Sequence, residues 1–246
     1  GMTVGVWEID ATRPSHELFS GRVTQVNADS WGNHANHVTG TIIGGDLIQF
    51  GARGMAYEAN ARAFNAFNDH SEMASEAASG LLVSNHSYGI PAAYLSTSIL
   101  GKYNSDARNV DLITYEAPYY LPVIAAGNDR DDGVSFDGYD ILTDMACNKN
   151  AMTVAAVRQL IFYDEPDDVE MSNFSSWGPT DDGRIKPDIS GKGVSTFSAS
   201  AESNSGYYVA SGTSMAAPNI AGSLILLQQH YLNVNGEFMR SSTLRG

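Results

Sequence analysis

Short apolar runs alternate with amphipathic stretches along the chain, a pattern typical of strands connected by helices. The strand candidates are residues 3–7, 61–67, 81–85, 121–126 and 152–157. The helix candidates are residues 34–44, 71–82, 106–117 and 216–231. The alternation predicts a three-layer α/β fold, with a mostly parallel central sheet and helices on both of its faces.

Three of the apolar runs end abruptly in a polar or glycine-containing turn. Glu8 follows the first run, Ser87 follows the third and Asn128 follows the fourth. Because sites in open α/β sheets form at the carboxyl ends of strands, we expect these three side chains at one edge. Gly127-Asn128 is by itself an ordinary turn signal. An amide at that place could also donate a hydrogen bond to an oxyanion.

A serine stands directly before the last predicted helix, in the segment Ser-Gly-Thr-Ser-Met at residues 211–215. Gly212 permits a tight bend, so Ser214 is expected at a helix N-terminus, where free amides favour developing negative charge. Pro218 is expected in the first turn of that helix, where no backbone donor is required. The alternative interpretation of Ser214 is an ordinary helix cap.

Two histidines, His34 and His37, lie three residues apart and would share one face of the first predicted helix. A serine hydroxyl needs a neighbouring base to become a nucleophile, and a histidine can supply it. A metal-binding pair is the alternative, but no adjacent glutamate and no third ligand stands out in the sequence.

Composition limits the class of protein. The chain has 246 residues, of which 43% are hydrophobic, and it shows no repeat or linker, so we expect a single domain over residues 1–246. Its 14 basic and 28 acidic residues give a net charge of −14, which disfavours nucleic acid and anionic membranes as partners. The single cysteine, Cys147, excludes an internal disulfide and is expected to pack in the core.

Two loops, at residues 129–139 and 164–170, are rich in acidic side chains. Such loops are usually solvated, but they can also hold calcium as a structural ion. No cofactor is expected to be required, and the metal ligands stay undetermined. The residues available for calcium are Asp129, Asp131, Asp132, Asp164, Asp167 and Asp168.

Together these segments resemble the subtilisin-like serine peptidases, or subtilases, over nearly the whole chain and in the family's order of acid, histidine and serine. Residues 34–41 (HANHVTGT) are similar to the histidine segment, residues 125–128 (AAGN) to the oxyanion segment and residues 212–216 (GTSMA) to the nucleophile segment. Residues 173–188 resemble the version found in larger bacterial subtilases that carry an added β-sandwich domain. We expect no such domain within residues 1–246, and we expect the peptidase domain to be shortened at both ends relative to the family.

The resemblance implies a serine endopeptidase acting on peptides or proteins through an acyl-enzyme, with Ser214 as nucleophile, His34 as general base and Asn128 as oxyanion donor. His37 would then be structural. The resemblance also implies a secreted or cell-surface location. An extended peptide would lie between two segments, Ser87-Tyr88-Gly89 and Ala125-Ala126-Gly127.

The acid is the place where the chain departs from the family pattern. Glu8 stands where subtilases have an aspartate, and Asp10 is the alternative carboxylate two residues further on. Glutamate is one methylene longer, and catalytic groups tolerate little misplacement, so Glu8→Asp is expected to raise activity. A second function stays open, that of a catalytically impaired pseudopeptidase that binds extended peptides. A general esterase is disfavoured because the Gly-x-Ser-x-Gly motif is absent around Ser214.

Overall fold

The computed structural model describes residues 1–27, 30–45, 49–132 and 138–246. Within them, seven strands form one sheet in the order β2-β3-β1-β4-β5-β6-β7, and every neighbouring pair is parallel. The strands are β1 (Thr3–Glu8), β2 (Val23–Gln25), β3 (Asn60–Asn65), β4 (Val83–His86), β5 (Leu121–Ala125), β6 (Met152–Val157) and β7 (Ile189–Lys192). A separate antiparallel hairpin consists of β8 (Thr196–Ala199) and β9 (Tyr207–Ala210).

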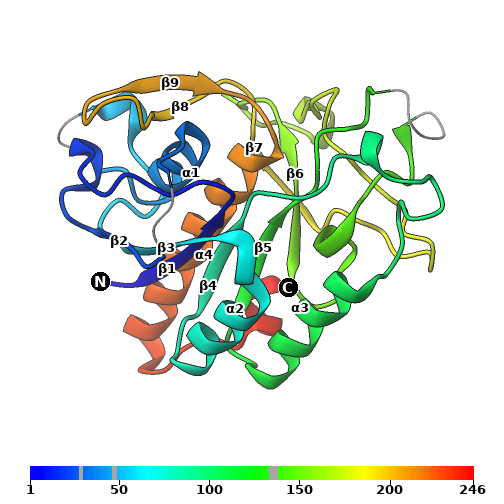
Figure 1. The fold of residues 1–246 in the computed structure, drawn as a ribbon, viewed down its shortest axis with the longest axis horizontal. Helices are drawn as coiled ribbons and strands as arrows, with labels where there is room; N and C mark the ends of the chain where they lie inside the picture. The colour runs from blue at the N-terminus through cyan, green and yellow to red at the C-terminus, as the bar shows by residue number, and fades with distance from the viewer. Residues whose placement is uncertain (28–29, 46–48, 133–137) are drawn as a thin grey trace.

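Helices cover both faces of the sheet, which confirms the predicted three-layer α/β architecture. Two of them, α1 and α4, pack against each other on one face, while α2 and α3 lie together on the other (Figure 1). The helices are α1 (Asn33–Ile43), α2 (Asp69–Ala78), α3 (Ser105–Glu116), α4 (Thr213–Asn235) and α5 (Ser241–Arg245).

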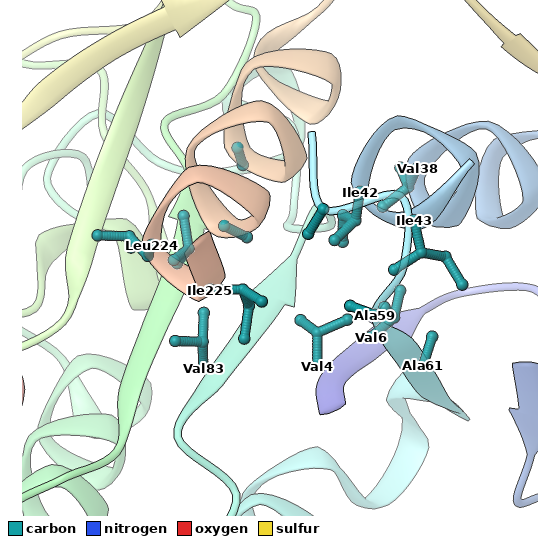
Figure 2. Packing of buried hydrophobic residues seen from close by; sticks show 14 of the residues in the cluster. Val4, Val6, Val38, Ile42, Ile43, Ala59, Ala61, Val83, Leu224 and Ile225 are labelled. Carbon is teal, nitrogen blue, oxygen red and sulfur yellow. The ribbon is translucent and has the colours of Figure 1, made fainter. Parts of the chain in front are cut away.

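The alternation of side chains along β1 builds the two cores of the molecule. Val4 and Val6 lie on the face that packs against α1 and α4, beside residues such as Ile42 and Leu224 (Figure 2). Trp7 points to the opposite face, where its ring stacks on Phe64 with the centroids 4.3 Å apart. Because both faces are covered at this point, β1 is apolar from Val4 to Trp7 rather than alternating with polar residues.

The five predicted strands correspond to β1, β3, β4, β5 and β6, and the four predicted helices to α1–α4. The short strands β2 and β7 were not predicted, because three or four residues containing polar side chains give no periodic signal. The last helix begins at Thr213 rather than at residue 216. Cys147 is buried as expected, and burial raises the pKa of its thiol to about 12, so it stays protonated.

No helix among the described residues combines the length and the hydropathy that crossing a bilayer requires. The longest, α4, has 23 residues, and its buried side chains belong mostly to its first half, where it packs against the central strands. The helix is therefore a central element of the core.

Candidate active site

Three strand ends bring the polar residues of the sequence motifs to one edge of the sheet. Strands β1, β4 and β5 are neighbours in the sheet and run in the same direction. Glu8 is the last residue of β1, Ser87 follows β4 directly, and Asn128 lies three residues beyond β5. The expectation that these three residues share one carboxyl edge is confirmed.

Helix α1 presents His34 to the end of β1. The Nδ1 atom of His34 lies 2.7 Å from Oε2 of Glu8, the carboxylate that contacts the imidazole in this structure. Glu8 is only 2% exposed, whereas the His34 side chain is 42% exposed. The carboxylate of Asp10 lies instead against Gly32, the residue before α1. One nitrogen of the ring is thus held from inside the protein while the ring stays open to solvent.

Burial and charge act in opposite directions on this pair. Burial raises the pKa of Glu8 above its ordinary value, and the neighbouring His34 partly offsets the increase. The charge of Glu8 in turn raises the pKa of His34, against the effect of the ring's own burial. The second carboxylate oxygen, Oε1, is buried and has no hydrogen-bond partner among the described residues. Glu8 therefore depends on His34 as its polar contact.

Ser214 is the second residue of α4, and it is joined to Ser87 by two hydrogen bonds. The Ser214 hydroxyl donates to the Ser87 carbonyl at 3.3 Å, and the Ser87 hydroxyl donates to the Ser214 carbonyl at 3.2 Å. The Asn85 side-chain amide donates to the Ser87 hydroxyl at 2.9 Å. The segment after β4 and the start of α4 are thereby fixed to each other.

Pro218 explains why the Ser214 carbonyl is available for this contact. In an α-helix that carbonyl would accept the N–H of residue 218, which proline lacks. Because α4 begins at Thr213, Pro218 lies beyond the first turn, and the expected first-turn position was wrong. The Ser87 hydroxyl replaces the missing donor, so the proline leaves no unsatisfied carbonyl beside Ser214.

The orientation of the Asn128 amide is set by Thr213. Oδ1 of Asn128 accepts hydrogen bonds from the Thr213 N–H at 2.8 Å and from the Thr213 hydroxyl at 3.1 Å. A backbone N–H can only donate, so the atom that it meets must be the amide oxygen, and the NH₂ group points elsewhere. The N–H of Ser214 forms no hydrogen bond to any described residue, as expected for the first turn of a helix. The NH₂ group of Asn128 and the N–H of Ser214 are thus two hydrogen-bond donors that no described residue engages.

A cavity of about 220 Å³ lies where these groups meet. Strands β4 and β5 pair as far as His86 and Ile124 and then separate, and the cavity opens between their continuations. Both segments predicted to bind a peptide line it, together with Asn128 and Ser214. An adjoining hollow is lined by Glu8, His34 and the shared wall of residues 87–89. β4 and β5 are central strands of the sheet, so a peptide would lie between their continuations and not along an edge of the sheet.

Tyr88, in the shared wall, is anchored by a buried chain of hydrogen bonds. Its hydroxyl donates to Asp69 at 2.8 Å and so accepts from Nδ1 of His86 at 3.0 Å. Nε2 of His86 then accepts from Ser84 at 2.8 Å, and Ser84 accepts from Tyr120. Burial lowers the pKa of His86 to about 3, so the ring is neutral and the direction of the chain is fixed.

The metal-binding alternatives find less support. Nε2 of His37 contacts the Thr196 carbonyl at 2.9 Å, and burial lowers the pKa of the ring to about 4. His37 is therefore held in the core, away from Glu8. No group of three or more His, Cys, Asp or Glu side chains suited to a metal occurs in the part of the chain that the structure describes. Calcium binding by the two acidic loops stays a prediction. Residues 133–137 of the first loop lie outside the described residues.

Sequence reasoning missed three features of this site. Thr213 orients Asn128, the Ser87 side chain supports the start of α4, and residues 143–146 form one wall of the cavity. Thr213 lies inside the GTS motif, but the motif itself indicates a role only for Ser214. Residues 143–146 carry no motif, and only the folded chain brings them beside Ser214.

The comparisons with known proteins agree with this arrangement. A family model described as the subtilase family matches residues 10–245, which is nearly the whole chain. The chain therefore belongs to the subtilase family.

Individual similarities are more limited in extent. The chain is 52% identical over 62 residues to the C5a peptidase of Streptococcus pyogenes serotype M18, a match that covers 25% of this chain and 5% of that protein. The solved patellamide maturation protease PatA aligns with 99% of this chain and 84% of its own, with a TM-score of 0.74 and 21% identity. A cold adapted subtilisin-like serine proteinase aligns with 99% of this chain and 80% of its own, with a TM-score of 0.64 and 24% identity. These structures show that the fold is subtilisin-like.

Proposed function

We propose that the chain is a serine endopeptidase that cleaves peptide bonds through an acyl-enzyme on Ser214. The Ser214 Oγ atom attacks the substrate carbonyl carbon while Nε2 of His34 takes the hydroxyl proton. Glu8 holds Nδ1 of His34 protonated, which leaves Nε2 free to accept, and stabilises the imidazolium that forms. The weak 3.3 Å hydrogen bond from Ser214 to Ser87 has to be released for this proton transfer.

The remaining steps use the same groups. Negative charge develops on the carbonyl oxygen, where Nδ2 of Asn128 and the N–H of Ser214 can donate hydrogen bonds. His34 then gives its proton to the departing amine as the carbon–nitrogen bond breaks, which leaves an acyl group on Ser214. Water, deprotonated by His34, attacks this ester, and the acid product leaves as Oγ regains its proton.

One observation carries this proposal: the Glu8–His34 pair and the two free donors beside Ser214 border adjoining cavities with a common wall. A buried carboxylate that fixes a half-exposed imidazole is a costly arrangement for a purely structural role, because burial penalises the charged acid. The hollow that it lines shares the wall of residues 87–89 with the cavity of Ser214, a serine at a helix N-terminus, and this arrangement favours catalysis.

Asn128→Ala is expected to lower kcat by about 10²–10³ with little change in KM, as the loss of one oxyanion donor does in subtilisin. The reason is that the amide acts only on charge present in the transition state. Steady-state kinetics on a peptide substrate measures the effect. A change carried mainly by KM would contradict the assignment of Asn128. Because Oδ1 also accepts from Thr213, thermal unfolding should be recorded for the same variant.

The pH dependence of kcat/KM is expected to follow the neutral form of His34. The charge of Glu8 raises the pKa of His34 above 6.5, so kcat/KM should fall as the pH drops through a value above 6.5. Glu8→Gln removes that charge and should move the acidic limb to lower pH. A limb that stays in place in this variant would show that Glu8 does not control the protonation of His34.

A denatured protein such as casein tests the proposed function directly. The chain should produce new N-termini inside the substrate, and Ser214→Ala purified in the same way should produce none. Cleavage that persists in Ser214→Ala, or no cleavage by folded protein, would contradict the proposal.

A peptide-binding pseudopeptidase is the second candidate. Two observations favour it: Oε1 of Glu8 is buried without a partner, and the Ser214 hydroxyl donates to Ser87 rather than to His34. Retained peptide binding without cleavage in the casein assay would support this candidate. In either case peptides or proteins are the proposed partners. A location outside the cell is likewise a proposal, which rests on membership of the subtilase family.

A further inference from the structure

The cavity beside Ser214 contains two carboxylates that the proposed chemistry does not use. Asp129 enters it directly after Asn128, and Asp144 enters it from the wall formed by residues 143–146. Asp129 is only 8% exposed. None of the described residues that line this cavity is basic, so the charged groups that they contribute are negative.

Apolar groups form much of the remaining wall. Ile124, Ala125 and Ala126 contribute from β5 and its continuation, and Met145 and Ala146 lie beside Asp144. Apolar walls with negative charges match a side chain that has an aliphatic stem and a cationic head. Lysine and arginine have this construction, whereas an aromatic or aliphatic side chain would leave the carboxylates buried without a cation.

On the basis of the proposed peptidase function, we infer that this cavity receives a lysine or arginine side chain, from the residue whose carbonyl Ser214 attacks. Asp129 and Asp144 are then specificity-determining residues, which favour a basic residue on the amino side of the cleaved bond. The net charge of −14 acts in the same direction, since it attracts basic peptides toward the protein.

Both carboxylates also have a structural contact with the loop at residues 90–92. Asp129 accepts the N–H of Ala92 at 3.0 Å. Asp144 accepts the N–H of Ile90 at 3.2 Å and, on its other oxygen, the side-chain amide of Asn104 at 3.3 Å. These contacts leave further lone pairs on each carboxylate, enough for a cation to be bound as well. Burial raises the pKa of both carboxyl groups, a penalty that a bound ammonium or guanidinium would offset. Substitution by asparagine removes the charge and retains an oxygen that can accept the loop amide.

The test uses four peptides built on a sequence that the protein cuts in the casein assay. They differ only in the residue before the cleaved bond, which is lysine, arginine, norleucine or glutamate. Norleucine keeps the stem of lysine without its ammonium, so the lysine-to-norleucine ratio of kcat/KM isolates the charge. We expect a ratio of about ten or more, and the slowest cleavage for glutamate.

The variants separate the local carboxylates from the charge of the whole protein. In the double variant Asp129→Asn, Asp144→Asn, the ratio should fall toward one while cleavage of the norleucine peptide persists. Asp167→Asn, an exposed site outside the cavity, is the matched control and should leave the ratio unchanged. Equal or faster cleavage of the norleucine peptide by the unmodified protein would overturn the inference and leave the peptidase function intact. If the lysine-to-norleucine ratio fell equally in Asp167→Asn, the preference for lysine would come from the overall charge of the protein. That result would also overturn the inference.

Discussion

Replacing either Ser214 or His34 with alanine is expected to lower kcat by about 10⁶, the size of the effect of the equivalent changes in subtilisin. The two groups act in a single proton transfer, so losing one disables the other. The double variant should therefore be no slower than either single variant. Single-turnover measurements with a chromogenic peptide are sensitive enough for the comparison.

The control for this prediction is the fold of each variant. His34→Ala leaves Glu8 buried without its polar contact, so this variant is expected to unfold at a lower temperature than Ser214→Ala. Activity is therefore compared at a temperature where circular dichroism shows both variants folded. Independent, multiplicative losses in the double variant would mean that His34 does not activate Ser214.

Glu8→Gln is expected to lower kcat by about 10⁴, the loss that the amide of the acid causes in the serine protease triad. A glutamine can turn its NH₂ group to Nδ1 of His34 and so stabilise the tautomer with hydrogen on Nε2. In that tautomer the ring cannot accept the Ser214 proton. The kinetics should show a loss in kcat with nearly unchanged KM.

The contact between Glu8 and His34 leads us to expect the opposite effect for Glu8→Asp. The sequence alone suggested that the shorter acid would raise activity. Oε2 of Glu8 already lies 2.7 Å from Nδ1 of His34, and an aspartate at the same backbone position would end about 1.5 Å short. We now expect kcat to fall by about 10–100-fold in Glu8→Asp, with Asp10→Ala close to the unmodified protein. A higher kcat in Glu8→Asp would show that glutamate at this position supports catalysis less well than aspartate.

The fold could be predicted because its signals are local. The apolar runs that form β1, β3, β4, β5 and β6 are long enough to show as strands, and the helices between them imply parallel pairing. The sheet order that places β4 between β1 and β5 comes from contacts between distant segments. No periodicity in the chain states that order, so it was not predicted from the sequence.

Some residues of the candidate site could likewise be predicted from local sequence, whereas others could not. Ser214, His34 and Asn128 stand in recognisable motifs, and the strand-end rule placed Glu8 beside them. The choice between Glu8 and Asp10 needed the structure, because it depends on which carboxylate the β1 turn directs at α1. Asp144 could not be found from sequence, since its role depends on residues 143–146 folding back against the ends of β4 and β5.

The most direct test of the account is covalent labelling with a fluorophosphonate probe, followed by peptide mapping of the modified residue. The account predicts one adduct, on Ser214, whose rate of formation falls at least about 10³-fold in His34→Ala. Folded protein that forms no adduct, or forms it at the same rate without His34, would contradict the claim that these two side chains act together.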